Sequence, residues 1–195
     1  MIKYLLLLLL TATAIVQGQA DEFSNTRYVS AFGGLNWLHL RQGNQAEFHP
    51  GYAAAFAVGY RITPSCRIEG ELGYRWNKIA NLEDITEGSR TYSLEGVKGN
   101  TQTYSCMANG YTDFDLGYWF TPYVGFGVGV AFNELTFEHR RGSKRFTNSA
   151  FASQAIVGAK APIAEQIDLG FEYRYLVSKG DMREQSAGLS LTYNY

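Results

Sequence analysis

The ten residues from Ser186 to Tyr195 read SAGLSLTYNY, and they decide the fold prediction. Every second residue is apolar or aromatic, and the residues between are small or polar. The first set is Ala187, Leu189, Leu191, Tyr193 and Tyr195, and the second is Ser186, Gly188, Ser190, Thr192 and Asn194. Because successive side chains of a β-strand point to opposite faces, the segment predicts a strand with one apolar face and one small, polar face.

The same alternation recurs in seven earlier segments. They are residues 27–38, 51–63, 66–76, 106–116, 122–133, 149–160 and 166–176. No helical period is sustained anywhere, and 15% of the 195 residues are aromatic. Together with the last ten residues, the pattern predicts one all-β domain of eight antiparallel strands.

The connections between these segments alternate in length. The short ones, residues 63–65, 117–122 and 161–163, each contain a proline, where a strand is expected to end. The long polar ones cover residues 39–50, 77–104, 134–148 and 177–185. Short turns at one rim and long loops at the other are typical of an up-and-down transmembrane barrel of the outer-membrane type, with the short turns in the periplasm.

A soluble, lipocalin-like binding barrel is the alternative, and it would turn its apolar face inward. Here the polar face is rich in glycine and alanine, which would weaken a strand that faces water but leave room for long side chains inside a narrow barrel. The sequence therefore favours the transmembrane barrel. The charged residues assigned to its interior are Arg67, Glu69, Glu71, Arg75, Glu172 and Arg174. Both signs occur, so we expect them to pair as a structural network.

The first twenty residues have the features of a secretory signal peptide. Lys3 precedes an apolar run over residues 4–16, and small residues lie one and three positions before Asp21. We predict cleavage after Ala20, which leaves residues 21–195 as the barrel domain. The removed segment holds one lysine and no acid, so 16 basic and 18 acidic residues remain. This balance does not indicate nucleic-acid binding.

Cys66 and Cys106 are the only cysteines in the sequence. An exported protein enters an oxidising compartment, where a disulfide has to be considered. The predicted strands place the two residues at opposite ends of the barrel, beyond the roughly 7 Å Cα separation that a bridge allows. We therefore predict two free thiols.

Four segments together resemble the OmpA-like, opacity-type surface-antigen family of eight-stranded outer-membrane barrels. They are residues 28–30, 121–129, 168–175 and 188–195, and the resemblance spans essentially the whole mature chain. It implies a porin-family surface protein of a Gram-negative outer membrane, in contact with outer-membrane lipid and lipopolysaccharide. It also implies that the terminal segment is recognised by the barrel-assembly machinery, through Gly188, Leu191, Tyr193 and Tyr195. We expect a monomer.

The expected function is that of a structural surface protein with adhesive or antigenic loops. Eight strands enclose an interior that side chains can fill, so a bulk-water pore is not expected. A narrow porin-like channel or a hydrophobic-ligand transporter is the first alternative. The third long loop holds a basic patch of His139, Arg140, Arg141, Lys144 and Arg145. This patch could bind lipopolysaccharide phosphates or sulfated glycans of a host surface, or it could be an ordinary solvated loop.

A lipid A-modifying enzyme is the second alternative. Such a hydrolase needs a serine, a histidine and an acid within hydrogen-bond reach of one another. The histidines His39, His49 and His139 all fall in predicted loops, and none has a serine beside it. We therefore expect no catalytic residues, no metal site and no cofactor.

Overall fold

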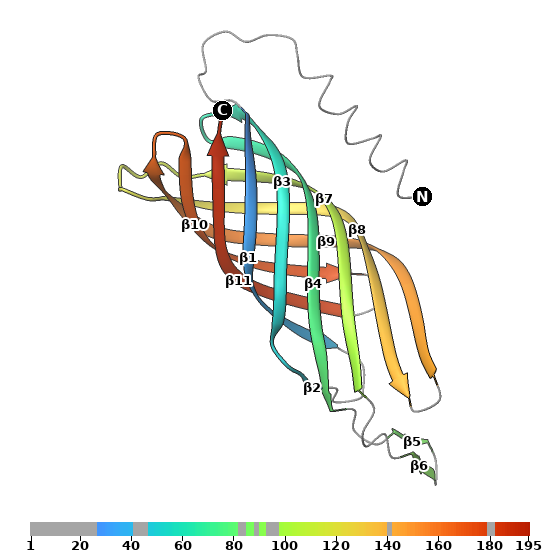
Figure 1. Cartoon of the computed structure of the whole chain (residues 1–195). Helices are drawn as coiled ribbons and strands as arrows, with labels where there is room; N and C mark the ends of the chain where they lie inside the picture. The colour runs from blue at the N-terminus through green and yellow to red at the C-terminus, as the bar shows by residue number, and fades with distance from the viewer. Residues whose placement is uncertain are drawn as a thin grey trace.

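The computed structural model describes residues 27–40, 47–81, 85–87, 90–92, 98–139, 142–178 and 182–195, and it shows a closed antiparallel barrel (Figure 1). Its eight long strands are β1 (Arg27–Leu40), β3 (Gly51–Thr63), β4 (Cys66–Asn81), β7 (Lys98–Asp113), β8 (Thr121–His139), β9 (Gly142–Ala164), β10 (Ile167–Ser178) and β11 (Met182–Asn194). The short strands are β2 (Glu47–Phe48), β5 (Ile85–Glu87) and β6 (Arg90–Tyr92). The predicted fold class is confirmed. Within the described part of the chain, no helix is long and apolar enough to cross a membrane.

Two pairings far apart in sequence close the ring. The last strand, β11, pairs with the first, β1, from Tyr28↔Asn194 to Leu40↔Met182. Elsewhere in the ring, β4 pairs with β7 across the long connection between these two strands. Every long strand therefore has a neighbour on both sides, and the ring has no edge at the level of the barrel.

The strands are staggered around the ring. From Trp76 in β4, the paired residues lead through β7 and β8 to Thr147 in β9. In the other direction they lead through β3, β1, β11 and β10 to Val157, ten positions away in the same strand. This offset is the shear of the barrel, and it goes with tilted strands and an interior about as wide as the side chains that fill it.

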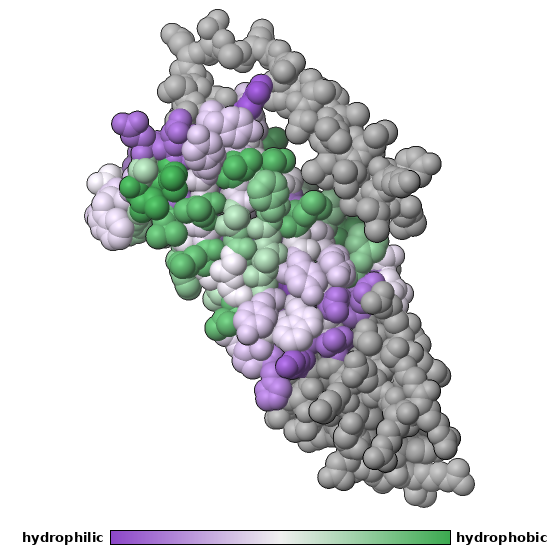
Figure 2. All heavy atoms as spheres, viewed as in Figure 1, coloured by the Kyte–Doolittle hydropathy of each residue, from purple (hydrophilic) through white to green (hydrophobic). Residues whose placement is uncertain are grey.

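The apolar faces of β3, β8 and β10 point outward. Phe56, Phe126 and Phe171 are each more than half exposed. Figure 2 shows a hydrophobic band around the visible side of the barrel, with more polar residues at both ends. A barrel that stands in water would bury this face, so the lipocalin-like alternative is wrong.

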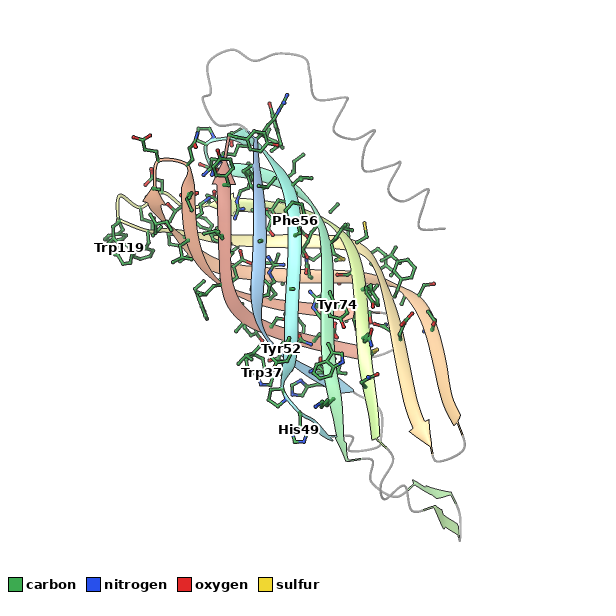
Figure 3. The ribbon with its side chains drawn as sticks, in the orientation of Figure 1. Trp37, His49, Tyr52, Phe56, Tyr74 and Trp119 are labelled. Atoms are coloured by element: carbon green, nitrogen blue, oxygen red, sulfur yellow. The ribbon has the colours of Figure 1, made fainter. Side chains whose placement is uncertain are left out.

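Aromatic side chains flank this band. In Figure 3, Trp37 and Tyr52 lie toward one end of the barrel and Trp119 at the other, with Phe56 between them. Tyr52 stacks on Trp76 with ring centroids 6.0 Å apart. Such girdles at both edges of an apolar band are typical of the interfaces between a bilayer and water.

Beyond the apolar band the strands are longer than predicted. β7 begins at Lys98 instead of residue 106, and β8 and β9 stay paired out to His139↔Gly142. Most of the predicted loop 134–148 is therefore a hairpin, and His39 lies on β1. The prediction failed here because a strand outside an apolar layer has water on both faces, so its sequence no longer alternates.

Two predictions near the short turns also need correction. Asp115 belongs to the predicted strand 106–116, but it lies in the turn after β7, where its carboxylate accepts the N–H of Gly117 at 3.1 Å. Gly117 has a φ of 73°, which glycine adopts without strain. Pro162 lies inside β9 rather than in a turn. The nitrogen of Pro162 points toward β8. The ladder with β8 starts only at the pair Thr121↔Lys160, so Pro162 lies beyond its end and its missing N–H removes no hydrogen bond.

The two cysteines are free, as predicted. Cys66 pairs with Thr112 of β7, whereas Cys106 lies six positions further along that strand, in its middle and opposite Leu72. The thiols are therefore on the order of 20 Å apart at about 3.3 Å per residue. Cys106 does not lie at the end of the barrel, because β7 begins eight residues before the predicted strand.

Candidate functional site

An ion pair crosses the middle of the barrel. Arg174 Nη1 lies 2.8 Å from Glu71 Oε2, and Arg174 Nη2 lies 2.7 Å from Glu172 Oε2. Glu71 is on β4 and Arg174 on β10, four strands apart in a ring of eight. Both side chains are buried. The pair therefore spans the full width of the interior.

Neutral side chains complete the hydrogen bonding of this pair. Asn109 Nδ2 donates to Glu71 Oε2 at 2.9 Å, and Gln154 Nε2 donates to Glu71 Oε1 at 3.2 Å. Tyr123 donates its hydroxyl hydrogen to Glu172 Oε1 at 2.7 Å. Buried charges are tolerated when hydrogen bonds satisfy their remaining lone pairs. Side chains from five strands thus form one polar layer across the barrel.

A second cluster fills the end where the short turns lie. Arg67 Nε is 3.1 Å from Asp113 Oδ1, and Arg67 Nη1 is 2.9 Å from Glu69 Oε1. Lys160 Nζ is 2.6 Å from Asp113 Oδ2. The guanidinium carbon of Arg67 also lies 4.1 Å from the ring centroid of Tyr111, a cation–π distance. This end of the barrel is closed by paired charges and aromatic rings.

A third cluster, toward the long hairpins, is less completely bonded. Thr103 donates to Glu184 Oε1 at 3.0 Å, and Arg75 Nη1 donates to Ser105 at 3.1 Å. Arg75 Nε lies 3.8 Å from Glu184 Oε2, which is too far for a hydrogen bond. Neither atom has a hydrogen-bond partner among the described residues. The outer third of the interior is polar but more loosely tied than the middle.

The structure places all six charges assigned to the interior inside the barrel. Five of them form two clusters, and Arg75 belongs to the third. Sequence reasoning missed Glu184 because it lies in the predicted loop 177–185. Ser186 is on the inward face of the terminal strand, and Glu184, two residues earlier, would have been found by extending the alternation of that strand toward the N-terminus. Gln154 was missed too, since its neighbours in β9 give only weak alternation.

The basic patch belongs to the β8–β9 hairpin. His139 is the last residue of β8, and Lys144 and Arg145 lie in β9 instead of in a loop. Arg140 and Arg141 lie outside the described residues, as do the side chains of the other three. In Figure 1, the paired strands β8 and β9 continue past the end of β10.

Comparison with known proteins identifies the barrel. A family model described as "Outer membrane protein beta-barrel domain" matches residues 5–195. The chain belongs to this family. The OmpA-like resemblance is thereby confirmed, and the protein is located in the bacterial outer membrane. The predicted signal peptide lies outside the described residues and stays a prediction.

Several solved outer-membrane barrels share the fold at low sequence identity. Neisserial surface protein A matches with a TM-score of 0.61 and 17% identity, over 89% of this chain and 100% of that chain. The attachment invasion locus protein Ail of Yersinia pestis matches with a TM-score of 0.55 and 11% identity, over the same shares. A major outer membrane protein from Thermus thermophilus matches with a TM-score of 0.59 and 11% identity, over 87% of this chain and 99% of that chain. No curated protein matches the sequence.

The predicted assembly signal lies along the β1–β11 seam of this outer-membrane barrel. Gly188 and Leu191 pair with residues of β1 and β10. Tyr193 stacks on Tyr195 at 6.3 Å and donates its hydroxyl hydrogen to Gln166 at 3.1 Å. Recognition of these residues by the assembly machinery stays a prediction.

The described residues contain no group of three or more histidine, cysteine, aspartate or glutamate side chains that could hold a metal ion. His49 is exposed between β2 and β3, and His39 is exposed on β1. The absence of catalytic residues stays a prediction.

Proposed function

We propose that this outer-membrane barrel is a rigid surface anchor whose β8–β9 hairpin binds anionic glycans on host surfaces. The observation that supports the anchor role is the buried ion pair between Glu71 and Arg174. A diffusion path along the axis would have to break this pair and separate Gln154 and Asn109 from Glu71. Removing one partner of such a buried pair costs several kcal/mol, on the order of 3 to 5.

The composition of the hairpin tip supports an anionic ligand. Residues 139–145 include four arginine or lysine residues and one histidine. Arginine binds sulfate and phosphate groups through paired N–H donors, and clustered positive charge attracts anions from a distance. The structurally similar Ail protein of Yersinia pestis is known in complex with the heparin analogue sucrose octasulfate. A sulfated glycan is therefore the ligand class we favour.

Heparin binding tests the glycan proposal on the full chain. The variant replaces Arg140, Arg141, Lys144 and Arg145 by serine. Its control replaces Lys78 and Arg183, two cations on the outer wall, by serine. We expect the hairpin variant to lose about tenfold or more in affinity at physiological salt, because charge-assisted bonds are lost, and the control to change little. Equal affinity in wild type and hairpin variant would overturn glycan binding at this site.

Planar-bilayer recording tests the anchor separately. The wild-type protein is expected to give no stable conductance, and the Arg174→Met variant to give transient openings at most. A stable single-channel current from the wild type would overturn the anchor role and favour the narrow channel. The heparin measurement does not depend on this outcome.

A further inference from the structure

The outer half of β9 has a free side. β9 pairs with β8 along its outer length to Gly142, but β10 reaches only Ser178, which pairs with Ala152. Within the described residues, the segment 142–151 therefore has a neighbour on one side and none on the other. An unpaired strand edge presents a row of N–H and C=O groups that can pair with another chain.

The hydrogen-bond pattern identifies the groups on this free side. The N–H of Asn194 donates to the carbonyl oxygen of Gln166 at 2.8 Å, so β10 bonds to β11 through even-numbered residues. Successive residues of an antiparallel strand direct their N–H and C=O groups to opposite neighbours, so β10 bonds to β9 through its odd-numbered residues. Their partners in β9 are odd-numbered too, as in the pair Val177↔Ser153. The free segment of β9 thus turns the N–H and C=O of its odd-numbered residues outward. They are Ser143, Arg145, Thr147, Ser149 and Phe151.

This edge lies beyond the apolar band. Thr147, Asn148 and Ser149 are all exposed, although their side chains alternate between the two faces of the strand. In the barrel wall only one of these faces is exposed, as at Phe151 and Ala152. Both faces of residues 147–149 therefore meet water, and a new strand could approach this part of the edge without contacting lipid.

The charge of the segment indicates which chain would pair with it. Lys144 and Arg145 lie in the edge strand itself, while the acids Glu134 and Glu138 lie on β8, one strand further in. A second copy of the same segment would bring like charges together. An acidic strand would bring opposite charges together, and cross-strand pairs of opposite charge stabilise a sheet.

We propose that the outer edge of β9 binds an extended acidic segment of another protein, which adds to the β7–β8–β9 sheet as its next strand. The backbone groups of Ser143, Arg145, Thr147 and Ser149, the odd-numbered residues beyond the apolar band, supply the affinity, as in other cases of strand addition. The positive charge of Lys144 and Arg145 selects an acidic partner. This site differs from the glycan proposal in chemistry, since it needs backbone donors rather than a cluster of cations.

A proline in the edge tests the proposal. Ser149→Pro removes one outward N–H but leaves the bonds to β8, because proline is tolerated on an edge strand when its nitrogen faces away from the ladder. Ser149→Ala is the matched control. The probe is a synthetic peptide, acetyl-TETVTETVTE-amide, and the N-methylated form of the same peptide is the control ligand. The measurements are peptide affinity and amide hydrogen exchange of the full-length protein in nanodiscs.

We expect the peptide to bind wild type and Ser149→Ala alike and to slow exchange at Thr147 and Ser149, but not at Asn148. Ser149→Pro and the N-methylated peptide are each expected to lower affinity about tenfold, because each removes backbone hydrogen bonds of the added strand. The proposal would be overturned if the peptide did not bind wild type or bound Ser149→Pro equally well. It would also be overturned if exchange slowed at Asn148 as much as at Thr147 and Ser149. Thr147→Pro is a second edge variant in case Ser149→Pro fails to fold. Heparin affinity of Ser149→Pro should remain that of wild type, which separates this site from the glycan site.

Discussion

The interior of the barrel and its outer hairpin are built from the same backbone ladder, yet they are held in different ways. In the interior, side chains from opposite strands meet, as Glu71 and Arg174 do across the full width. In the outer hairpin, β8 and β9 are paired beyond the end of β10. The stability of the fold should therefore depend on the interior, whereas the hairpin can change with little effect on the barrel.

Removing Arg174 should lower the stability of the barrel more than a change on its outer wall or in its hairpin. Arg174→Met leaves Glu71 and Glu172 buried without their cation, so we expect a loss of about 3 to 5 kcal/mol in the free energy of unfolding. Urea titration of the protein refolded in lipid vesicles measures it. The double variant Glu71→Gln, Arg174→Met should lose less than the single variant. A double variant that is less stable than Arg174→Met would contradict the pairing.

The outer wall gives the next largest effect. Leu72 points outward from the middle of β4. Leu72→Arg should lower the free energy of unfolding by roughly 2 to 4 kcal/mol in a bilayer, since a cation near the midplane is poorly solvated. Leu72→Thr is the control and should cost less. Equal losses in the two variants would show that the position does not face lipid.

Glycines on the inward and outward faces of the barrel wall should respond differently to an added methyl group. A Cβ at Gly127 would collide with the Oδ1 of Asn109 in the interior, whereas a Cβ at Gly110, on the outer face, meets no atom within 4 Å. Gly127→Ala should therefore cost about 1 to 3 kcal/mol by overpacking. Gly110→Ala should be neutral or slightly stabilising, by up to about 1 kcal/mol. The same urea titration compares them, and a costly Gly110→Ala would argue against an open outer face.

Shortening the hairpin should have the smallest effect on stability. Replacing residues 136–145 by Asn-Gly joins Leu135 to Phe146, which already pair, through a two-residue turn. We expect the free energy of unfolding to change by no more than about 0.5 kcal/mol, as for surface changes remote from the core. Heparin affinity should fall in the same variant. A loss of several kcal/mol would show that the hairpin supports the barrel.

The sequence predicts the membrane-facing part of the molecule well where alternation is strict, as in β3 and β4, because there one face meets lipid and the other the interior. β3 was predicted residue for residue, and the inward side of β4 was correct from Arg67 to Arg75. The outer hairpins were not predictable in this way, since water on both faces removes the alternation. Individual contacts such as Thr103 with Glu184 depend on the shear of the closed ring, which no single strand encodes.

The pairing of β1 with β11 also has a consequence for the timing of folding. Tyr28 and Asn194 are partners in the ladder although almost the entire exported chain lies between them. Closure therefore has to wait until the last strand has been delivered, and one side of β1 has no partner while synthesis or export is under way. Contacts this distant in sequence make folding slow. Until closure, the open edge of β1 can pair with other chains, so the protein must be protected from aggregation until its last strand is in place.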